Sequence, residues 1–238
     1  MQDKIQKLRQ MLSDSEKVVF FGGAGVSTES GIPDFRSVDG LYSQQWKYPP
    51  ETILSRSFFL RNSAEYFRFH RAKLVIEGAE PNAAHFRLAR LEQEGKLTAV
   101  ITQNIDGLHQ KAGSKNVLEL HGSILRAYCD KCGKRHDAAL VNYGDNVPLC
   151  DCGGIIRPDI VLYEEALDEK ILYESVRLIR EADMLIIGGT SLNVYPAAGL
   201  INYYHGDKLV LINLSSTPYD SYADLVINEK IGAVFYQI

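Results

Sequence analysis

The first stretch with the composition of a binding site follows the apolar run 18–21. It contains two closely spaced glycines, Gly23 and Gly25, and ends in IPDFR at 32–36. Glycines directly after a buried strand let the backbone turn sharply and approach a ligand, and free N–H groups there suit a phosphate. The dehydrogenase pattern G-x-G-x-x-G is incomplete, because its third glycine, counted from Gly23, falls on Thr28. By itself this turn fits a tight loop as well as it fits a dinucleotide site.

The four cysteines form two close pairs with the spacing of a metal site. Cys129 and Cys132 are followed by Cys150 and Cys152. Each pair can supply half of a tetrahedral four-sulfur shell for Zn²⁺, and a site with four protein ligands would be closed and structural. The second pair is C-x-C, where C-x-x-C is commoner. We favour structural zinc over four independent thiols, over His136 as a competing ligand and over a nucleic-acid-binding zinc module.

Polar residues also follow two other apolar runs. The run 99–102 leads into Gln103, Asn104 and Asp106, and His121 precedes a glycine after 118–120. Amide and carboxylate groups at the end of a buried strand either face a cleft or cap a turn. Histidine, with a pKa near 6.5, is the natural general base. Each segment alone fits turn residues and a structural histidine better than it fits catalytic groups.

Short apolar runs alternate with helical patterns, which predicts a parallel sheet covered on both faces. Asp168 is placed as an N-cap, and ligands of such sheets bind at the carboxyl ends of the strands. The expected strands are 18–21, 99–102, 184–187, 209–213 and 225–227, and the expected helices are 82–94, 168–181 and a shorter one opened by Pro196.

Two segments interrupt this alternation. The first, 37–77, is rich in aromatic residues and is expected to be a helical insertion whose rings serve packing rather than recognition. The second, 125–157, holds the cysteines and is expected to be a zinc-binding module. The sequence therefore predicts the α/β class, with a Rossmann-like, doubly wound parallel sheet and a smaller zinc-ribbon plus helical module. We expect one catalytic domain over 1–238.

The composition excludes several classes of protein. A chain of 238 residues with 45% hydrophobic content buries a large core. The net charge of −4 gives no basic footprint for nucleic acid, and the longest apolar runs are too short to cross a bilayer. The polar N-terminus has no signal-peptide pattern. We expect a cytoplasmic protein with neither nucleic acid nor membrane as partner.

Taken together, the motifs resemble those of bacterial-type sirtuins, the NAD-dependent protein deacylases of the silent-information-regulator family. The resemblance runs in the right order through nearly the whole chain. Besides the paired cysteines and His121-Gly122, the matching segments are G-A-G-x-S-x-x-S-G-I-P-D-F-R at 23–36, T-Q-N-I-D-x-L-H at 102–109, G-T-S-L at 189–192 and Ile212-Asn213.

The resemblance implies a protein deacetylase that transfers the acetyl group of acetyl-lysine to ADP-ribose and releases nicotinamide. NAD would be a co-substrate and Zn²⁺ structural, the partners would be acetyl-lysine-bearing proteins, and the chain would be a monomer. Catalytic roles fall on His121, Asn104 and Asp106, with His121 as general base on the ribose hydroxyls. The residues implied to contact NAD are Gly23, Ala24, Gly25, Thr28, Ile32, Asp34, Phe35, Arg36, Gln103, Asn104, Ile105, Asp106, His121, Gly189, Thr190, Ser191, Asn213, Leu214 and Ile231.

The same resemblance implies how the substrate peptide binds and which acyl group it carries. The peptide would pair as an added strand with Val161, Leu162 and Tyr163. Glu164 stands where many relatives have glycine, which leaves peptide preference at that point open.

Relatives that prefer succinyl or malonyl groups carry a Tyr-x-x-Arg pair, and the matching positions here are Phe67 and His70. A short neutral acyl group, acetyl first, is therefore expected, while Arg68 and Arg71 leave another acyl group open. The rival functions are an NAD hydrolase or ADP-ribosyltransferase on the same scaffold and a non-catalytic binding module. A dehydrogenase is disfavoured by the missing third glycine.

Overall fold

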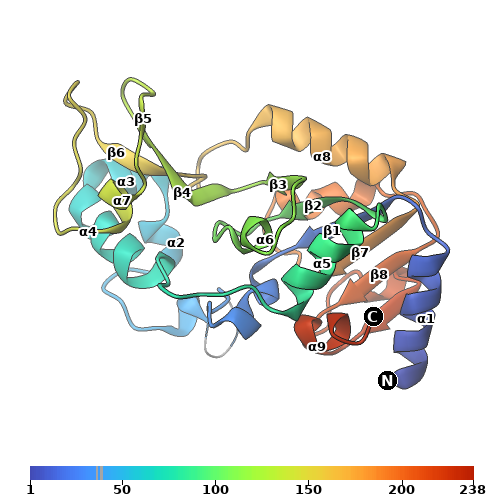
Figure 1. Cartoon of the computed structure of the whole chain (residues 1–238). Helices are drawn as coiled ribbons and strands as arrows, with labels where there is room; N and C mark the ends of the chain where they lie inside the picture. Colours follow the sequence, from blue (N-terminus) through green and yellow to red (C-terminus); the bar gives the residue numbers. More distant parts are fainter. Residues whose placement is uncertain (36, 38–39) are drawn as a thin grey trace.

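The computed structural model describes residues 1–35, 37 and 40–238 (Figure 1). Its larger part is a parallel sheet with the strand order β3-β2-β1-β7-β8-β9. The strands are β1 (Val18–Gly22), β2 (Leu97–Thr102), β3 (Val117–Glu119), β7 (Met184–Gly188), β8 (Leu209–Ile212) and β9 (Leu225–Ile227). All five predicted strands are present. The strand order reverses between β1 and β7, where open α/β sheets bind ligands.

Side chains of the central strands alternate between two cores, because successive residues of a strand point to opposite faces. Val18 and Phe20 pack with α1 (Gln2–Ser13), α5 (Ala83–Gln93) and α9 (Ile231–Phe235). Val19 and Phe21 pack on the other face, against α8 (Glu169–Glu181) and the 3₁₀ helix η5 (Ala197–Tyr203). Figure 1 shows α8 on one side of the sheet and α1, α5 and α9 on the other. The predicted cover on both faces is confirmed.

Side-chain caps fix where the two long central helices begin. The carboxylate of Asp168 accepts the N–H groups of Lys170 (2.9 Å) and Ile171 (3.0 Å), which confirms the predicted cap of α8. Asn82 and His85 form a reciprocal capping box at α5. The segment opened by Pro196 is a 3₁₀ helix rather than an α-helix.

The smaller part of the molecule combines both interrupting segments. Its antiparallel sheet has the order β5-β4-β6, formed by β4 (Gly122–Cys129), β5 (Arg135–His136) and β6 (Ile156–Ile160). Its helices are α2 (Pro50–Ile53), α3 (Arg56–Arg61), α4 (Ser63–Phe69), the π-helical turn η4 (His70–Leu74) and α7 (Ala139–Asn142). One hydrophobic core joins the buried aromatic side chains of 58–69 to Ile124, Cys129 and Ile156, so these rings serve packing as predicted.

The remaining elements are short. They are η1 (Ala24–Val26), η2 (Thr28–Ser30), η3 (Leu41–Ser43), α6 (Leu108–Lys111) and η6 (Asp220–Tyr222). Within the described residues, every helix is too short or too polar to cross a lipid bilayer.

Three histidines are buried in the uncharged form. Burial lowers the pKa of His70 and of His85 to about 4, and that of His109 to about 3. The rings of His85 and His109 lie 4.7 Å apart, between α5 and α6. Because these side chains bind protons more weakly when folded, acid favours the unfolded chain.

We expect the free energy of unfolding to decrease as the pH falls below about 6.5, since the unfolded chain then binds more protons than the folded one. The His109→Leu variant should lose about 2 kcal/mol of the difference in unfolding free energy between pH 7 and pH 5. Denaturant titrations at both pH values measure this difference. The His205→Leu variant, at an exposed position, is the control, and an unchanged pH dependence in His109→Leu would contradict the account.

Candidate active site

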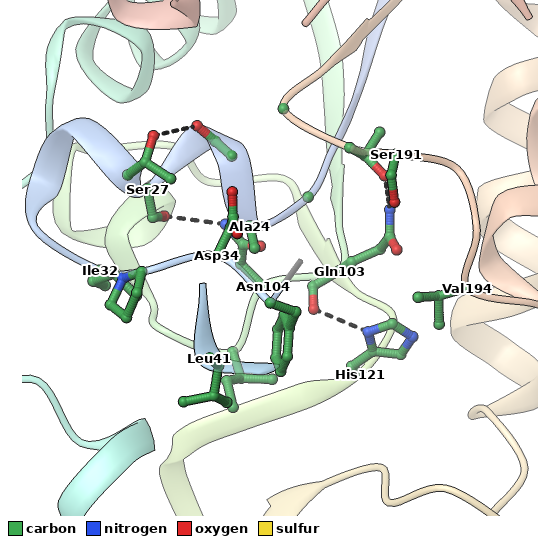
Figure 2. A pocket seen from close by; sticks show the side chains of 18 of the residues that line it. Ala24, Ser27, Ile32, Asp34, Leu41, Gln103, Asn104, His121, Ser191 and Val194 are labelled. Carbon is green, nitrogen blue, oxygen red and sulfur yellow. Dashed lines mark hydrogen bonds between the residues drawn. The ribbon is translucent and has the colours of Figure 1, made fainter. Parts of the chain in front are cut away.

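A cavity of 480 Å³ lies at the carboxyl ends of β1, β2, β7 and β8 (Figure 2). Residues of the smaller part, including Leu54, Leu74 and Ile160, form its opposite wall. Every residue predicted to contact NAD or the peptide lines this cavity, apart from Arg36, which lies outside the described residues. The cavity therefore brings the predicted site residues together from seven separate segments of the chain.

Two glycine turns meet at the point where the strand order reverses. The amide of Gly25 donates to the carbonyl of Gly189 at 2.8 Å. A Cβ atom on Gly25 would lie 2.7 Å from the Gly189 Cα atom, and Gly189 itself has a φ of +59°. Only glycine permits this contact at both positions. The chain then forms η1 and η2 instead of a long helix, so the third dehydrogenase glycine, which serves helix packing, is not required.

A buried hydrogen-bond network connects this loop to the segment after β2. Ser27 donates to Asp106 Oδ2 at 2.6 Å, and Asn104 Nδ2 donates to Ser27 Oγ at 3.1 Å. The other Asp106 oxygen accepts the N–H of Leu108 at 2.9 Å. The Asp106 carboxylate and the Asn104 amide are thereby held in fixed orientations on the cavity wall.

His121 enters the cavity from the turn between β3 and β4 (Figure 2). Its Nδ1 lies 3.0 Å from the Gln103 carbonyl oxygen. Because a carbonyl only accepts, Nδ1 carries the proton and Nε2 keeps its lone pair. Burial lowers the pKa of His121, while the hydrogen bond to Gln103 opposes this. The side chain is thus a neutral base near neutral pH, oriented through its backbone partner.

The far end of the cavity is built from the segments after β7 and β8. Asn213 Oδ1 accepts the N–H of Thr190 at 2.9 Å, and Thr190 Oγ1 accepts from Gln103 Nε2 at 3.0 Å. The Nδ2 group of Asn213 is buried without a partner among the described residues. A ligand hydroxyl here would satisfy this donor, which fits the predicted contact of Asn213 with a ribose.

The predicted peptide segment is tied to the protein mainly through its amides. Val161 N–H donates to the His121 carbonyl at 3.0 Å, and Tyr163 N–H donates to that of Leu54 at 2.9 Å. Glu164 has a φ of +76°, which is uncommon for a residue other than glycine. Its carboxylate accepts the backbone N–H (2.8 Å) and hydroxyl (3.0 Å) of Ser57 at the start of α3. These bonds hold the left-handed turn in place.

The four cysteines gather at one end of the smaller part, with all four sulfur atoms within 4.8 Å of one another. The Sγ atoms of Cys129 and Cys152 are 3.4 Å apart, and those of Cys132 and Cys150 are 3.9 Å apart. A tetrahedral zinc site with Zn–S bonds of about 2.3 Å requires S–S distances of about 3.8 Å. The donor set therefore fits structural zinc, and His136 is not part of this cluster.

The two positions that would indicate an acidic acyl group do not line the cavity. Phe67 and His70 are buried in the smaller part, with His70 Nε2 lying 2.8 Å from Asn142 Oδ1. The π-helical turn η4 instead presents Lys73 and Leu74 to the cavity. The preference for a short neutral acyl group therefore stays a prediction.

Several residues that line the cavity were not predicted from the sequence. Ser27 links Asn104 to Asp106. It belongs to the first motif, but no role was predicted for it. The segment Val194–Pro196 and the turn residues 215–217 also line the cavity. No local pattern indicated this role of Ser27, because its partners Asn104 and Asp106 lie 77 and 79 residues further along the chain. The other two segments carry no recognisable pattern either.

Fold and site together define an α/β protein with a large cavity at the point where the strand order of its parallel sheet reverses. The protein-family model described as Sir2 family matches residues 23–196. The chain is 58% identical over 236 residues to an NAD-dependent protein deacetylase of Clostridium acetobutylicum, covering 98% of this chain and 96% of that protein. It is 57% identical to one of Clostridium perfringens, covering 100% and 99%. The chain belongs to the Sir2 family.

Solved structures agree with this assignment. A Sir2 structure with deacetylated p53 peptide and 3′-O-acetyl ADP ribose superposes with a TM-score of 0.90 at 40% identity, covering 98% of this chain and 96% of that chain. A Sir2 structure with p53 peptide and NAD⁺ gives a TM-score of 0.87 at 41% identity, with the same coverage. The larger parallel sheet and the cysteine-bearing part are therefore the fold of Sir2 enzymes.

The close contact between the turns of Gly25 and Gly189 predicts that one added methyl group at Gly25 will disturb both the fold and the binding of NAD. In the Gly25→Ala variant the Cβ would meet backbone atoms of Gly189, so we expect about 1–3 kcal/mol lower stability and at least tenfold weaker NAD binding. In Gly199→Ala the nearest atom is a Tyr195 ring carbon at 3.6 Å, and both properties should stay near those of the original protein. Calorimetric titration with NAD and denaturant unfolding measure the two effects. Equal behaviour of the variants would contradict the account.

Proposed function

We propose that this protein is an NAD-dependent protein-lysine deacetylase whose general base is His121. The observation that carries the proposal is the orientation of this imidazole. Its Nδ1 is committed to the Gln103 carbonyl, and the ring lines a cavity that joins the dinucleotide end of the sheet to the segment 161–163. The overall reaction consumes acetyl-lysine, NAD and water, and it yields lysine, nicotinamide and acetyl-ADP-ribose. NAD supplies the ADP-ribosyl acceptor and the nicotinamide leaving group.

The chain's own residues divide the work along the cavity. His121 Nε2 takes a proton from a ribose hydroxyl so that this oxygen can attack the acyl carbon. Asn104 and Asp106, held through Ser27, position the nicotinamide and the ribose. Asn213 Nδ2 would donate to the adenosine half, and the bond from Thr190 N–H to Asn213 Oδ1 fixes the orientation of this side chain. Apolar side chains, among them Ile32 and Phe35, limit the access of water.

We assign the acetyl-lysine peptide to Val161–Tyr163, where it would add as a strand. The backbone N–H groups of Val161, Leu162 and Tyr163 all have partners within the protein, so the peptide would donate its own N–H groups to carbonyl oxygens of this segment, each of which has two lone pairs. Zinc held by the four cysteines would supply folding energy and no reaction step, because four protein ligands leave no open position.

We infer that the chain forms a single catalytic domain over 1–238, with the helical insertion at 37–77 and the zinc-binding module at 125–157. The protein would act as a monomer in the cytoplasm, on proteins rather than on nucleic acid or membranes, in keeping with its net charge of −4.

Replacing the base tests the proposal. We expect His121→Ala to lower the kcat of deacetylation about 10²–10⁴-fold while NAD binding and the melting temperature change little. In the original protein, kcat/KM should fall on the acid side with a midpoint below about 6.5, since burial lowers the pKa of His121. Peptide mass spectrometry and nicotinamide release, measured from pH 5 to 8, give both quantities.

The His205→Ala variant, altered at an exposed histidine, should show the original rate. Turnover by His121→Ala at that same rate would remove this residue from the mechanism.

A further inference from the structure

A group of four charged side chains connects the cysteine cluster to the predicted peptide segment. Its members are Asp130, Arg56, Arg157 and Glu165, and we call them the charge bridge. We propose that the charge bridge holds the peptide segment in its binding conformation and makes that conformation depend on the metal loop. This inference rests on the function proposed above.

One end of the charge bridge lies inside the metal loop. Asp130 follows Cys129 directly, and its backbone N–H donates to the Ile155 carbonyl at 2.8 Å. Its two carboxylate oxygens accept from both terminal nitrogens of Arg56, at 2.6 and 2.8 Å. This two-bond geometry fixes the direction of the Arg56 side chain. Any change in the metal loop therefore reaches α3, where Arg56 is the first residue.

The other end of the charge bridge lies in the peptide segment. Glu165 accepts from Arg157 with both oxygens, at 2.5 and 2.9 Å. Its Oε2 also accepts the N–H of Leu162 at 2.8 Å, and its own N–H donates to the Leu162 carbonyl at 3.1 Å. The carboxylate thus closes the turn that follows Leu162. The ion pair of Glu165 with Arg157 therefore supports, together with the backbone bonds described above, the shape of the segment that would receive the peptide.

The two ends of the charge bridge also interact with each other. Arg157 Nη1 lies 3.6 Å from Asp130, and Arg56 Nε lies 3.7 Å from Glu165. The Arg157 side chain is 1% exposed and lies against the rings of Phe59 and Tyr128. Two guanidinium groups thus balance two carboxylates in a partly buried position. Loss of one carboxylate leaves an uncompensated cation there, so the remaining members must rearrange.

The backbone strengthens this connection at the same place. Arg56 N–H donates to the Tyr163 carbonyl at 2.9 Å, so Arg56 contacts both the metal loop and the peptide segment. The dinucleotide end of the cavity is lined by the segments after β1, β2, β7 and β8. Among the described residues, no hydrogen bond or ion pair joins these segments to the charge bridge. A defect in the charge bridge should therefore weaken peptide binding and spare NAD binding.

The test compares two aspartates that stand next to metal ligands. Asp130→Asn removes one carboxylate of the charge bridge. Asp151→Asn is the matched control, because Asp151 is 91% exposed and pairs only with Lys134 among the described residues. Four quantities are measured on each protein: bound zinc, the affinity for NAD, the affinity for an acetyl-lysine peptide against its unacetylated form, and amide hydrogen exchange over 158–167.

For Asp130→Asn we expect peptide affinity to fall about tenfold, corresponding to about 1.4 kcal/mol, and exchange at Leu162 and Tyr163 to become faster. Zinc content and NAD affinity should stay as in the original protein. Asp151→Asn should change none of the four quantities. Unchanged exchange in Asp130→Asn, or an equal loss of NAD and peptide affinity, would overturn the proposal.

A second variant covers the case in which Asp130→Asn loses its zinc. Arg56→Lys is remote from the cysteines in sequence and keeps the positive charge, but it cannot bond both Asp130 oxygens in the same way. Peptide affinity should again fall with zinc retained, and normal exchange over 158–167 in this variant would overturn the proposal. If the original protein failed to bind the acetylated peptide, the proposed function would be wrong, while the exchange data would still decide whether the charge bridge holds the segment.

Discussion

The contact between the turns after β1 and β7 is the constraint on which the site depends. Parallel strands end side by side, and the reversal of strand order at β1 and β7 opens a crevice between their loops. At Gly25 and Gly189 the two backbones touch at a distance that excludes a side chain. This contact lets the loop of 23–35 leave the sheet toward the smaller part of the molecule. Ser27 then reaches Asn104 and Asp106, and one continuous cavity results.

The smaller part contributes the second wall and the second substrate segment. Its helices α2, α3 and α4 and its cysteine-bearing sheet share one hydrophobic core, although α5, β2, α6 and β3 separate them in the sequence. The charge bridge crosses the same junction and ends at the turn after Leu162. Chemistry at the sheet and recognition at the smaller part are thus supported by different interactions. His121 stands between them, bonded through its side chain to Gln103 and through its carbonyl to Val161.

Much of this arrangement was predictable because it follows local rules. Apolar runs of four to five residues gave the strands, and Asp168 gave the start of α8. Site residues at strand ends came together because those ends share one edge of the sheet. The helix α1 escaped notice, since its apolar face is only Ile5, Leu8, Met11 and Leu12 in a charged segment. The 3₁₀ form of η5 escaped as well, because short helical forms differ little in sequence pattern.

The contacts that complete the site were beyond prediction for a different reason. Glu164 adopts a left-handed conformation that its type does not favour, and only its bonds to Ser57, 107 residues earlier, make the position intelligible. The bond from Ser27 to Asp106 likewise spans 79 residues. Such partners are set by the folded surface on which they meet. The spacing of residues in the sequence therefore carries no information about these long-range partners.

The most direct test of the account is a product analysis of the original protein with an acetyl-lysine peptide, in the presence and absence of NAD. Mass spectrometry should find deacetylated peptide, nicotinamide and acetyl-ADP-ribose in equal amounts, and none of the three without NAD. Nicotinamide released while the acetylated peptide stays intact would contradict the account, because the cavity would then serve hydrolysis of NAD alone.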